Sequence, residues 1–243
     1  MPDTADKGLD LVLATDLDAT LVGDTSSLQR LNAWLAARHP RVFLIYLTGR
    51  HTLAAWELIA KEHLLLPDVL VCDLGTIVRS APGFHRERRW EERFLPEWPV
   101  GQIERACAAV PFVLRQRWRP PWRRSYYLLE HTALNRIEAA LSGLPVKAVV
   151  SGANVDVIPQ SGGKGPALHH IVAAWGLPPD RVLVCGDSGN DLDMLSLGYK
   201  SAVVGNASLE RSALPPGIFI AVQGFAAGIL EALSHFGWPV SKS

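Results

Sequence analysis

Short apolar runs alternate with helix-like segments at both ends of the chain, and this alternation limits the fold more than any other feature. The apolar runs have strand length and lie at 11–15, 42–47, 69–72, 181–185, 201–205 and 218–222. Segments with helical spacing separate them, beginning with SSLQRLNAWLAARH at 26–39. Continuous apolar strands separated by helices are typical of a parallel sheet covered on both faces. The sequence therefore predicts an α/β fold whose core is a parallel sheet covered by helices on both faces.

The middle of the chain has a different composition. It is rich in Arg, Trp and Pro, with strand candidates at 112–116, 125–130, 147–151 and 155–159, and helix candidates near 100–109 and 132–142. We interpret this block as a smaller α+β domain inserted between strands of the core. The predicted division is a core made of residues 1–79 and 160–243, and an inserted domain at 80–159.

The composition excludes several classes of protein. With 243 residues, 48% hydrophobic and 20% charged, the chain is an ordinary globular protein. Its formal net charge of zero argues against a dedicated nucleic-acid binder. The polar start MPDTADKGLD and the absence of a long apolar run predict neither a signal peptide nor a membrane span. Three cysteines without metal-type spacing are interpreted as reduced thiols, and we expect a cytoplasmic protein.

Polar clusters follow the predicted strands at the points where ligands bind in open α/β sheets. They are DLDAT at 16–20, TGR at 48–50, Lys164 within SGGKGPA, and GDSGND at 186–191. The carboxyl ends of parallel strands meet at one edge of a sheet. We therefore expect these four distant clusters to converge on one site.

Asp16 and Asp18 come directly after the first predicted strand, where alternation would place both carboxylates on one face. Asp16 is the candidate nucleophile, because a carboxylate can accept a phosphoryl group. Asp18 can act as general acid and base, and Thr20 can orient these groups or the substrate by hydrogen bonding. The alternative interpretation is a helix cap or an acidic turn, in which Asp and Thr are common.

Asp187 and Asp191 are four residues apart, which predicts that they lie one turn apart on a helix. Several carboxylates in one cleft need a cation, and hard oxygen ligands suit Mg²⁺. The alternative is that Asp187 and Asn190 only cap this helix.

Thr48 and Lys164 fit the binding of a phosphate group. Thr48 and the N–H groups of Gly49 and Arg50 begin a predicted helix, where anions bind readily. Lys164 would bring a positive charge to the phosphoryl oxygens. The alternative for Lys164 is an ordinary solvated surface lysine.

With DLDAT, LTGR, Lys164 and GDSGND in order, the chain resembles the haloacid-dehalogenase (HAD) superfamily, and within it the phosphatases with an inserted α/β cap domain. The resemblance implies a HAD-like Rossmannoid core with a smaller α+β cap domain. It also implies Asp16 as nucleophile, Asp18 as general acid and base, and Thr48 and Lys164 as phosphate-binding groups. It also implies Mg²⁺ held by Asp16, the Asp18 carbonyl and Asp187. Asp191 and Asn190 are implied to support the metal and the phosphate.

A narrower similarity lies in DLDATLVGD, PPWRRSYYLLE, VDVIPQSGGKG and CGDSGND, which resemble sucrose-phosphate phosphatases. Mannosylfructose-phosphate phosphatases are nearly as similar, especially around LGTIV and VVGNA. The resemblance implies a disaccharide phosphate as substrate, with sucrose 6-phosphate favoured, and a sucrose-phosphate synthase as a partner of an otherwise monomeric enzyme. Three departures from the sucrose-phosphate phosphatase pattern are a missing glutamate after Gly75-Thr76, Arg123 in place of lysine, and Asn154 in place of aspartate.

Five arginines occur between Arg115 and Arg124, interleaved with two tryptophans. One interpretation is a solvated basic surface. The functional interpretation follows from the resemblance. It places Arg123, Ser125 and Tyr126 of the insert over the active site, where they would bind the substrate. Residues expected at the mouth of the site are Arg50, His51 and Gly75. An alternative of another class is a non-catalytic partner of a sugar-phosphate synthase that kept the fold.

Overall fold

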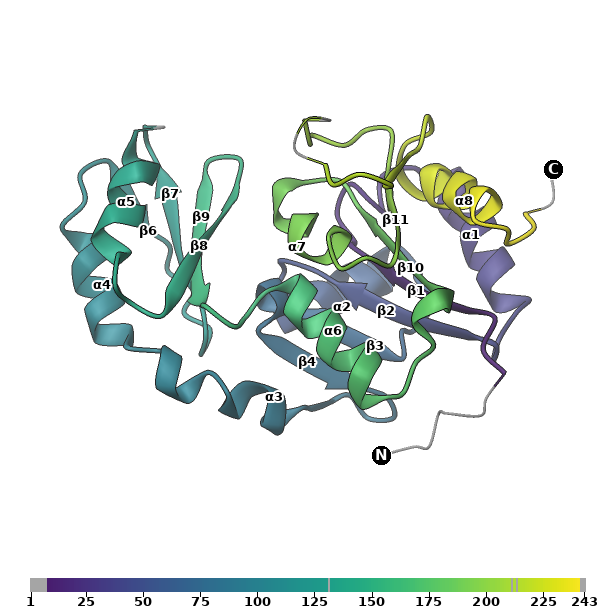
Figure 1. Ribbon diagram of the computed structural model, residues 1–243, viewed down its shortest axis with the longest axis horizontal. Helices are drawn as coiled ribbons and strands as arrows, with labels where there is room; N and C mark the ends of the chain where they lie inside the picture. The colour runs from purple at the N-terminus through teal and green to yellow at the C-terminus, as the bar shows by residue number, and fades with distance from the viewer. Residues whose placement is uncertain (1–7, 131, 211, 213, 241–243) are drawn as a thin grey trace.

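The computed structural model describes residues 8–130, 132–210, 212 and 214–240. Its larger part is an eight-stranded sheet with the strand order β12-β11-β10-β1-β2-β3-β4-β5 (Figure 1). These strands are β1 (Leu11–Thr15), β2 (Val42–Leu47), β3 (Val69–Cys72), β4 (Ile77–Ser80), β5 (His85–Arg86), β10 (Val182–Gly186), β11 (Lys200–Val203) and β12 (Phe219–Ile220). The strands from β12 to β3 are parallel, whereas β4 and β5 pair antiparallel at one edge.

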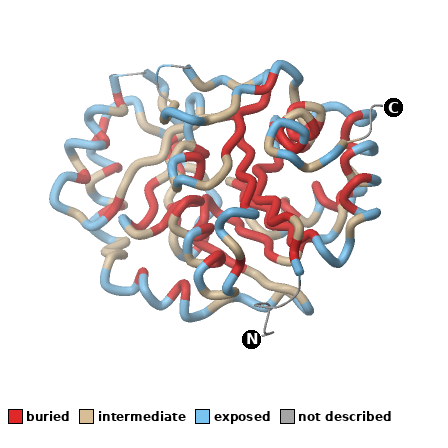
Figure 2. The backbone as a smooth tube through the Cα atoms, turned by 45° about the vertical axis from the view of Figure 1, so that its right-hand side comes forward, coloured by how far each residue is buried: buried red, intermediate tan, exposed pale blue. Residues whose placement is uncertain are grey.

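Helices cover both faces of this sheet. Successive side chains of a buried strand point to opposite faces, and each face has its own hydrophobic cluster. Leu11 and Leu13 pack with α1 (Thr25–Ala36), α2 (Thr52–Lys61) and α8 (Phe225–His235). Val12 and Ala14 pack on the other face with α6 (Lys164–Ala174) and α7 (Leu192–Leu195). The buried backbone is accordingly concentrated in the central strands (Figure 2).

The smaller part is a four-stranded antiparallel sheet, which we call the cap sheet, with the strand order β6-β7-β9-β8. Its elements are β6 (Val113–Arg115), β7 (Arg124–Leu128), β8 (Val146–Ser151) and β9 (Asn154–Pro159), with helices α4 (Val100–Ala108) and α5 (Ala133–Leu141). The two helices pack on one face through a third hydrophobic cluster. The chain between the two sheets forms α3 (Arg88–Glu92) and η2 (Leu95–Glu97).

The predicted fold class is confirmed: a mainly parallel core sheet is covered by helices on both faces, and a smaller α+β unit is inserted into it. Sequence reasoning missed β4 and β5, which extend the main sheet to Arg86, beyond the predicted boundary at residue 80. The domain limits stay a prediction, and residues 1–7, 131, 211, 213 and 241–243 lie outside the described part. Within that part, no helix has the length and hydropathy needed to cross a bilayer.

Candidate active site

The four polar clusters converge at the carboxyl edge of the main sheet, which faces the cap sheet (Figure 1). Asp16 directly follows β1, and its N–H donates to the carbonyl of Cys185 in neighbouring β10, at 3.0 Å. Thr48 directly follows β2, and its N–H donates to the carbonyl of Val71 in β3, at 2.9 Å. Regular parallel pairing thus places the first residue after each strand in a defined position at this edge.

Lys164 is the charged residue at the centre of the site. Its side chain is 1% exposed, and Nζ lies 2.7 Å from Asp16 Oδ1 and 2.7 Å from Asp191 Oδ1. Burial by itself lowers the pKa of a lysine, but the two carboxylates outweigh it and raise the pKa of Lys164 above its ordinary value. The alternative of a solvated surface lysine is therefore wrong, and Lys164 is a buried cation.

Two glycines, Gly163 and Gly75, pack closely at the start of α6 beside Lys164. Gly163 precedes α6 with φ of 124°, in the left-handed region that favours glycine, and a Cβ there would lie 2.4 Å from Asp193 Oδ2. Gly75 packs against the same point with φ of 88°, and a Cβ on it would lie 2.1 Å from the Gly163 carbonyl oxygen. The carbonyl of Gly75 accepts a hydrogen bond from Trp90 Nε1 at 3.0 Å. Gly75, expected at the mouth of the site, is instead buried against the backbone of Gly163 and Lys164.

Asp187 and Asp191 enclose a short turn. The Asp191 carboxylate oxygen Oδ2 accepts from the N–H groups of Asp187 and Ser188, at 3.0 and 3.1 Å. Asp187 Oδ1 accepts from the hydroxyl of Thr20 at 2.9 Å. The predicted placement of both aspartates on one helix is wrong, because Asp187 precedes the 3-10 turn η4 (Gly189–Asp191). Thr20, predicted to orient the acidic groups or the substrate, is fully buried and orients Asp187.

Asp16, Asp187 and Asp191 form a buried acidic cluster. One carboxylate oxygen from each lies within 4.8 Å of the others. Burial is the main cause that raises the pKa of Asp16 to about 8, against the lowering effect of Lys164, and burial also raises the pKa of Asp187. Three buried carboxylates face a single lysine, so a divalent cation would offset the excess negative charge. The oxygen donor set fits Mg²⁺.

Asp18 lies outside this cluster, which corrects its expected place beside Asp16. Strand β1 ends at Thr15, so strand alternation does not extend to these two residues. Arg50 binds the Asp18 carboxylate in a bidentate fashion, with Nε–Oδ2 and Nη2–Oδ1 distances of 2.7 Å each. The Arg50 side chain is 38% exposed and the Asp18 side chain is 48% exposed. The Asp18 carboxylate is thus at the open rim of the site, and only its backbone carbonyl remains a candidate metal ligand.

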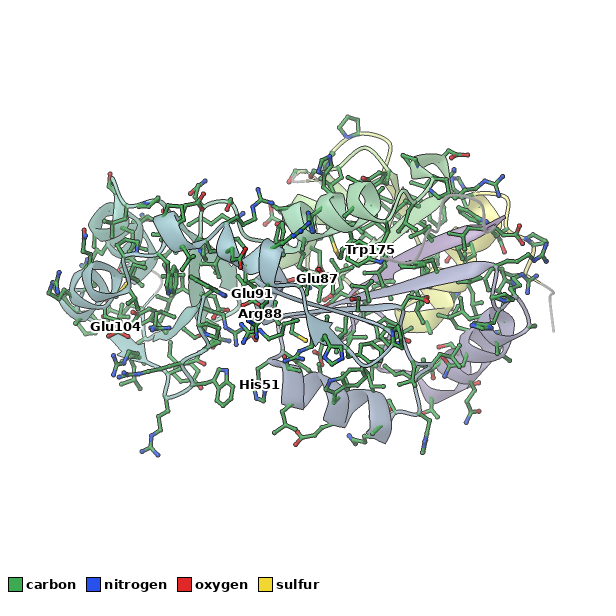
Figure 3. The ribbon with its side chains drawn as sticks, turned by 90° about the horizontal axis from the view of Figure 1, so that it is seen from below. His51, Glu87, Arg88, Glu91, Glu104 and Trp175 are labelled. Atoms are coloured by element: carbon green, nitrogen blue, oxygen red, sulfur yellow. The ribbon has the colours of Figure 1, made fainter. Side chains whose placement is uncertain are left out.

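The segment from Thr48 to His51 is where the sequence predicts a phosphate cradle. It precedes α2, which begins at Thr52, so the prediction that Thr48, Gly49 and Arg50 begin this helix is wrong. Thr48 is buried, and its Oγ1 accepts from the N–H of Arg50 at 3.1 Å. His51 caps α2 by accepting from the N–H of Ala54 at Nδ1, at 3.2 Å. Its ring stacks on Trp118 of the inserted domain, with centroids 4.3 Å apart. His51 therefore lies where the two parts of the molecule meet (Figure 3).

The three residues predicted from the insert separate onto two faces of the cap sheet. Ser125 donates to Asp156 Oδ1, and Arg123 reaches into the core, where Nη1 donates to the Gly49 carbonyl at 2.6 Å. Tyr126 is 2% exposed within the hydrophobic cluster under α4 and α5. The expectation that Tyr126 contacts substrate is wrong, because neighbouring residues of a strand point to opposite faces.

A cavity of about 370 Å³ opens between the core and the cap sheet. Strand β8 lines one side with Lys147–Val150, and the core lines the other with Lys164, Asn190 and Asp193. Asn190 is half-buried there, and its Oδ1 accepts from the hydroxyl of Ser188 at 3.3 Å. The cavity connects the buried lysine to the inserted domain, as expected for a site that the insert covers.

Sequence reasoning missed Asp73 and Asp156, although a signal for Asp73 was present. Asp73 directly follows the apolar run VLVC, just as Asp16 follows the first strand. It is buried, and its Oδ1 lies 2.9 Å from Arg123 Nη2. Asp156 pairs with Ser125 across β9 and β7, and only the register of these strands reveals this.

Comparison with known proteins agrees with the motifs. A family model described as sucrose-6F-phosphate phosphohydrolase matches residues 9–237. Sucrose-phosphatase 1 of Nicotiana tabacum is 30% identical over 251 residues, which cover 93% of this chain and 59% of that protein. Mannosylfructose-phosphate phosphatase of Agrobacterium fabrum is 28% identical over 239 residues, which cover 93% of this chain and 96% of that protein.

Among solved structures, the sucrose-phosphatase from Synechocystis sp. PCC6803 in complex with sucrose and phosphate is similar over 94% of this chain and 98% of that chain. The TM-score is 0.87 and the sequence identity 29%. This chain spans 59% of the length of the plant sucrose-phosphatases that it matches. The resemblance predicted from the motifs is confirmed.

Proposed function

Because this chain belongs to the sucrose-6F-phosphate phosphohydrolase family, we propose that it hydrolyses the phosphomonoester of a disaccharide phosphate, with sucrose 6-phosphate as its substrate. The observation that carries this proposal is the buried Lys164 held between Asp16 and Asp191, at 2.7 Å from each. A dead homologue has no reason to keep a lysine and carboxylates buried at such cost. The non-catalytic alternative is therefore disfavoured.

In the proposed mechanism Asp16 attacks the phosphorus atom, and the ester bond to the sugar oxygen breaks as the aspartyl-phosphate forms. Asp18 gives its proton to the leaving sugar oxygen. Asp18 then takes a proton from water, which attacks the phosphorus and releases phosphate from Asp16. This sequence requires Asp18 to leave Arg50, its partner at 2.7 Å, and to turn toward the reacting group.

The remaining groups bind and orient the phosphate. Lys164 would face the phosphoryl oxygens as a fixed positive charge, together with the Thr48 hydroxyl and the N–H of Gly49. Asp16, Asp187, Asp191 and the Asp18 carbonyl are the residues that would hold Mg²⁺. When bound, Mg²⁺ supplies electrostatic stabilisation of the charge on the phosphoryl group.

Mannosylfructose 6-phosphate is the second candidate substrate. One observation favours it: the mannosylfructose-phosphate phosphatase matches this chain over 96% of its own length, at nearly the identity of the sucrose-phosphatases. We further propose that the enzyme is a monomer and acts in the cytoplasm, where its three buried and unpaired cysteines would stay reduced. A glycosyltransferase that acts on a sugar phosphate must supply such a substrate, so a sucrose-phosphate synthase is the partner we propose.

A phosphate-release assay tests the proposal. The panel contains sucrose 6-phosphate, mannosylfructose 6-phosphate, glucose 6-phosphate and a small aryl phosphate, with Asp16→Asn as the inactive control. We expect a far higher kcat/KM for the disaccharide phosphates than for glucose 6-phosphate, because a site that binds hydroxyl groups rejects analogues that lack them. Equal turnover of sucrose 6-phosphate and glucose 6-phosphate would refute the disaccharide assignment. Absence of phosphate release from every compound would refute the assignment of phosphatase activity.

A further inference from the structure

We propose that Arg123 and Asp73 form a latch that holds the inserted domain closed over the active site. Arg123 precedes β7 of the cap sheet, and Asp73 directly follows β3 of the core. The Arg123 Nη2–Asp73 Oδ1 distance is 2.9 Å, and the side chains are 9% and 5% exposed, respectively. An ion pair this well buried is little screened by solvent, so its two charges attract each other more strongly than those of a surface pair do.

The latch also reaches the phosphate cradle. Arg123 Nη1 donates to the carbonyl of Gly49 at 2.6 Å, while Nη2 faces Asp73. The backbone of Asp73 is bonded to the same loop, because its N–H donates to the Arg50 carbonyl at 2.9 Å. The Leu74 N–H likewise donates to the Thr48 carbonyl, at 3.2 Å. One guanidinium therefore joins the inserted domain to the loop that would receive the phosphate.

The geometry requires arginine. A planar guanidinium can reach the Gly49 carbonyl and the Asp73 carboxylate with two different nitrogens, whereas a lysine amine is a single point charge. Both terminal nitrogens are thus engaged by the core. The remaining Nε lies 3.8 Å from Asp156 Oδ1, on the cap sheet. This arrangement makes Arg123 a positioning residue that acts through the phosphate cradle, in place of the sugar contact expected for it.

The charged form of Asp73 is stabilised by Arg123. Burial raises the pKa of Asp73, and Arg123 is the main group that opposes this effect. When the domains separate, Asp73 loses the cation that faces it, and the cradle loses the donor to Gly49. The latch thus favours the closed arrangement even before a substrate arrives. Its consequence for catalysis rests on the proposed function, because closure matters for the rate only if the site hydrolyses a phosphate ester.

The neighbouring arginine provides a matched control. Arg124 donates from Nε to Glu104 Oε1 at 2.7 Å and from Nη1 to the carbonyls of Pro120 and Arg123, at 2.8 and 2.7 Å. All three partners belong to the inserted segment, and Glu104 lies away from the junction of the two parts (Figure 3). Arg124→Met removes the same chemical group from the adjacent position without touching the core.

The experiment measures domain separation directly. Spin labels are attached to Asn135→Cys on α5 and Ser234→Cys on α8, which are exposed, whereas the three native cysteines are buried. Inter-label distances are recorded without substrate in the parent and in Arg123→Met, Asp73→Asn, the double variant and Arg124→Met. Arg123→Lys, which keeps the charge, is a milder variant in case Asp73→Asn does not fold. Thermal unfolding by circular dichroism verifies folding of each.

We expect Arg123→Met and Asp73→Asn to shift the distances to longer values, Arg123→Lys to shift them part of the way, and Arg124→Met to leave them unchanged. We also expect kcat/KM for the disaccharide phosphate to fall about 10-fold or more in each single latch variant. The double variant should lie within about twofold of the more affected single variant, because the two residues form one interaction. Unchanged distances in Arg123→Met and Arg123→Lys, or additive losses of activity, would overturn the latch. The distance measurement decides this even if no sugar phosphate is hydrolysed.

Discussion

Replacement of Lys164 by methionine tests the electrostatic core of the site. Methionine keeps much of the length of the side chain and removes the charge that lies 2.7 Å from both Asp16 and Asp191. Removal of one partner from a buried ion pair costs about 3–5 kcal/mol, because the other charge is left uncompensated. Here two buried carboxylates lose their partner at once when Asp16 is ionised, so we expect a loss at the upper end of this range in metal-free buffer at pH 9, above the pKa of Asp16. Catalytic activity should be lost as well.

The assay is urea unfolding of the parent and of Lys164→Met in the presence of EDTA, with Lys61→Met as a control. Lys61 pairs with Glu62 at 3.3 Å but is 78% exposed, and surface pairs contribute about 0–1 kcal/mol. Burial raises the pKa of Asp16 to about 8 although Lys164 lowers it, so Lys164→Met should raise this pKa further. Asp16 of the variant then takes up its proton at a higher pH than Asp16 of the parent, and the penalty in Lys164→Met should shrink as the pH falls toward about 8. Below this pH Asp16 is protonated in both folded proteins, and the penalty should change little. A Lys164→Met variant as stable as the Lys61→Met control at pH 9 would refute the argument.

Further outcomes follow from the same geometry. Asp16→Asn should abolish phosphate release with an unchanged circular dichroism spectrum, and Asp18→Asn should lower kcat by about 10²–10⁴-fold; near-parent turnover by Asp16→Asn would contradict the assignment. Chelation should silence the enzyme and Mg²⁺ should restore it, whereas full activity after rigorous metal removal would contradict the acidic site. Ser125→Ala should weaken the preference for disaccharide phosphates over glucose 6-phosphate, while Tyr126→Phe leaves this ratio of kcat/KM values unchanged. Burial is the main cause that lowers the pKa of His170 in the folded protein. As the pH falls, the unfolded chain therefore protonates this histidine before the folded protein does, and the stability should fall below about pH 6.5. His170→Asn should reduce this loss of stability, as measured by thermal unfolding.

The core of the site was predictable because regular structure places it. Asp16 and Thr48 follow continuous apolar runs, and parallel pairing brings the ends of such strands to a common edge. The burial of Lys164 followed less directly from its place among glycines at the start of a helix. Where a residue directly follows a strand of the main sheet, its position could be inferred from the sequence.

Residues one or two positions further along were not predictable in the same way. Asp18 lies past the end of β1, where the chain turns, and its partner Arg50 comes from another loop. Tyr126 was misplaced because the register of β7 against the helices decides which face is buried. Such contacts depend on tertiary packing, for which a single sequence carries no local signal.

The loop Thr48–Arg50 links the separate parts of the site. Gly49 accepts from Arg123 of the inserted domain, and the adjacent Arg50 binds the Asp18 carboxylate. An arriving phosphate would compete for the same few groups, because the cradle lies between these two contacts. Its negative charge would attract Arg50 and so release Asp18, which the proposed proton transfer requires. Since Gly49 and Arg50 are adjacent, the domain contact and the proton donor are governed by one short segment. Substrate binding and release of the general acid are then expected to occur together, with the inserted domain already closed.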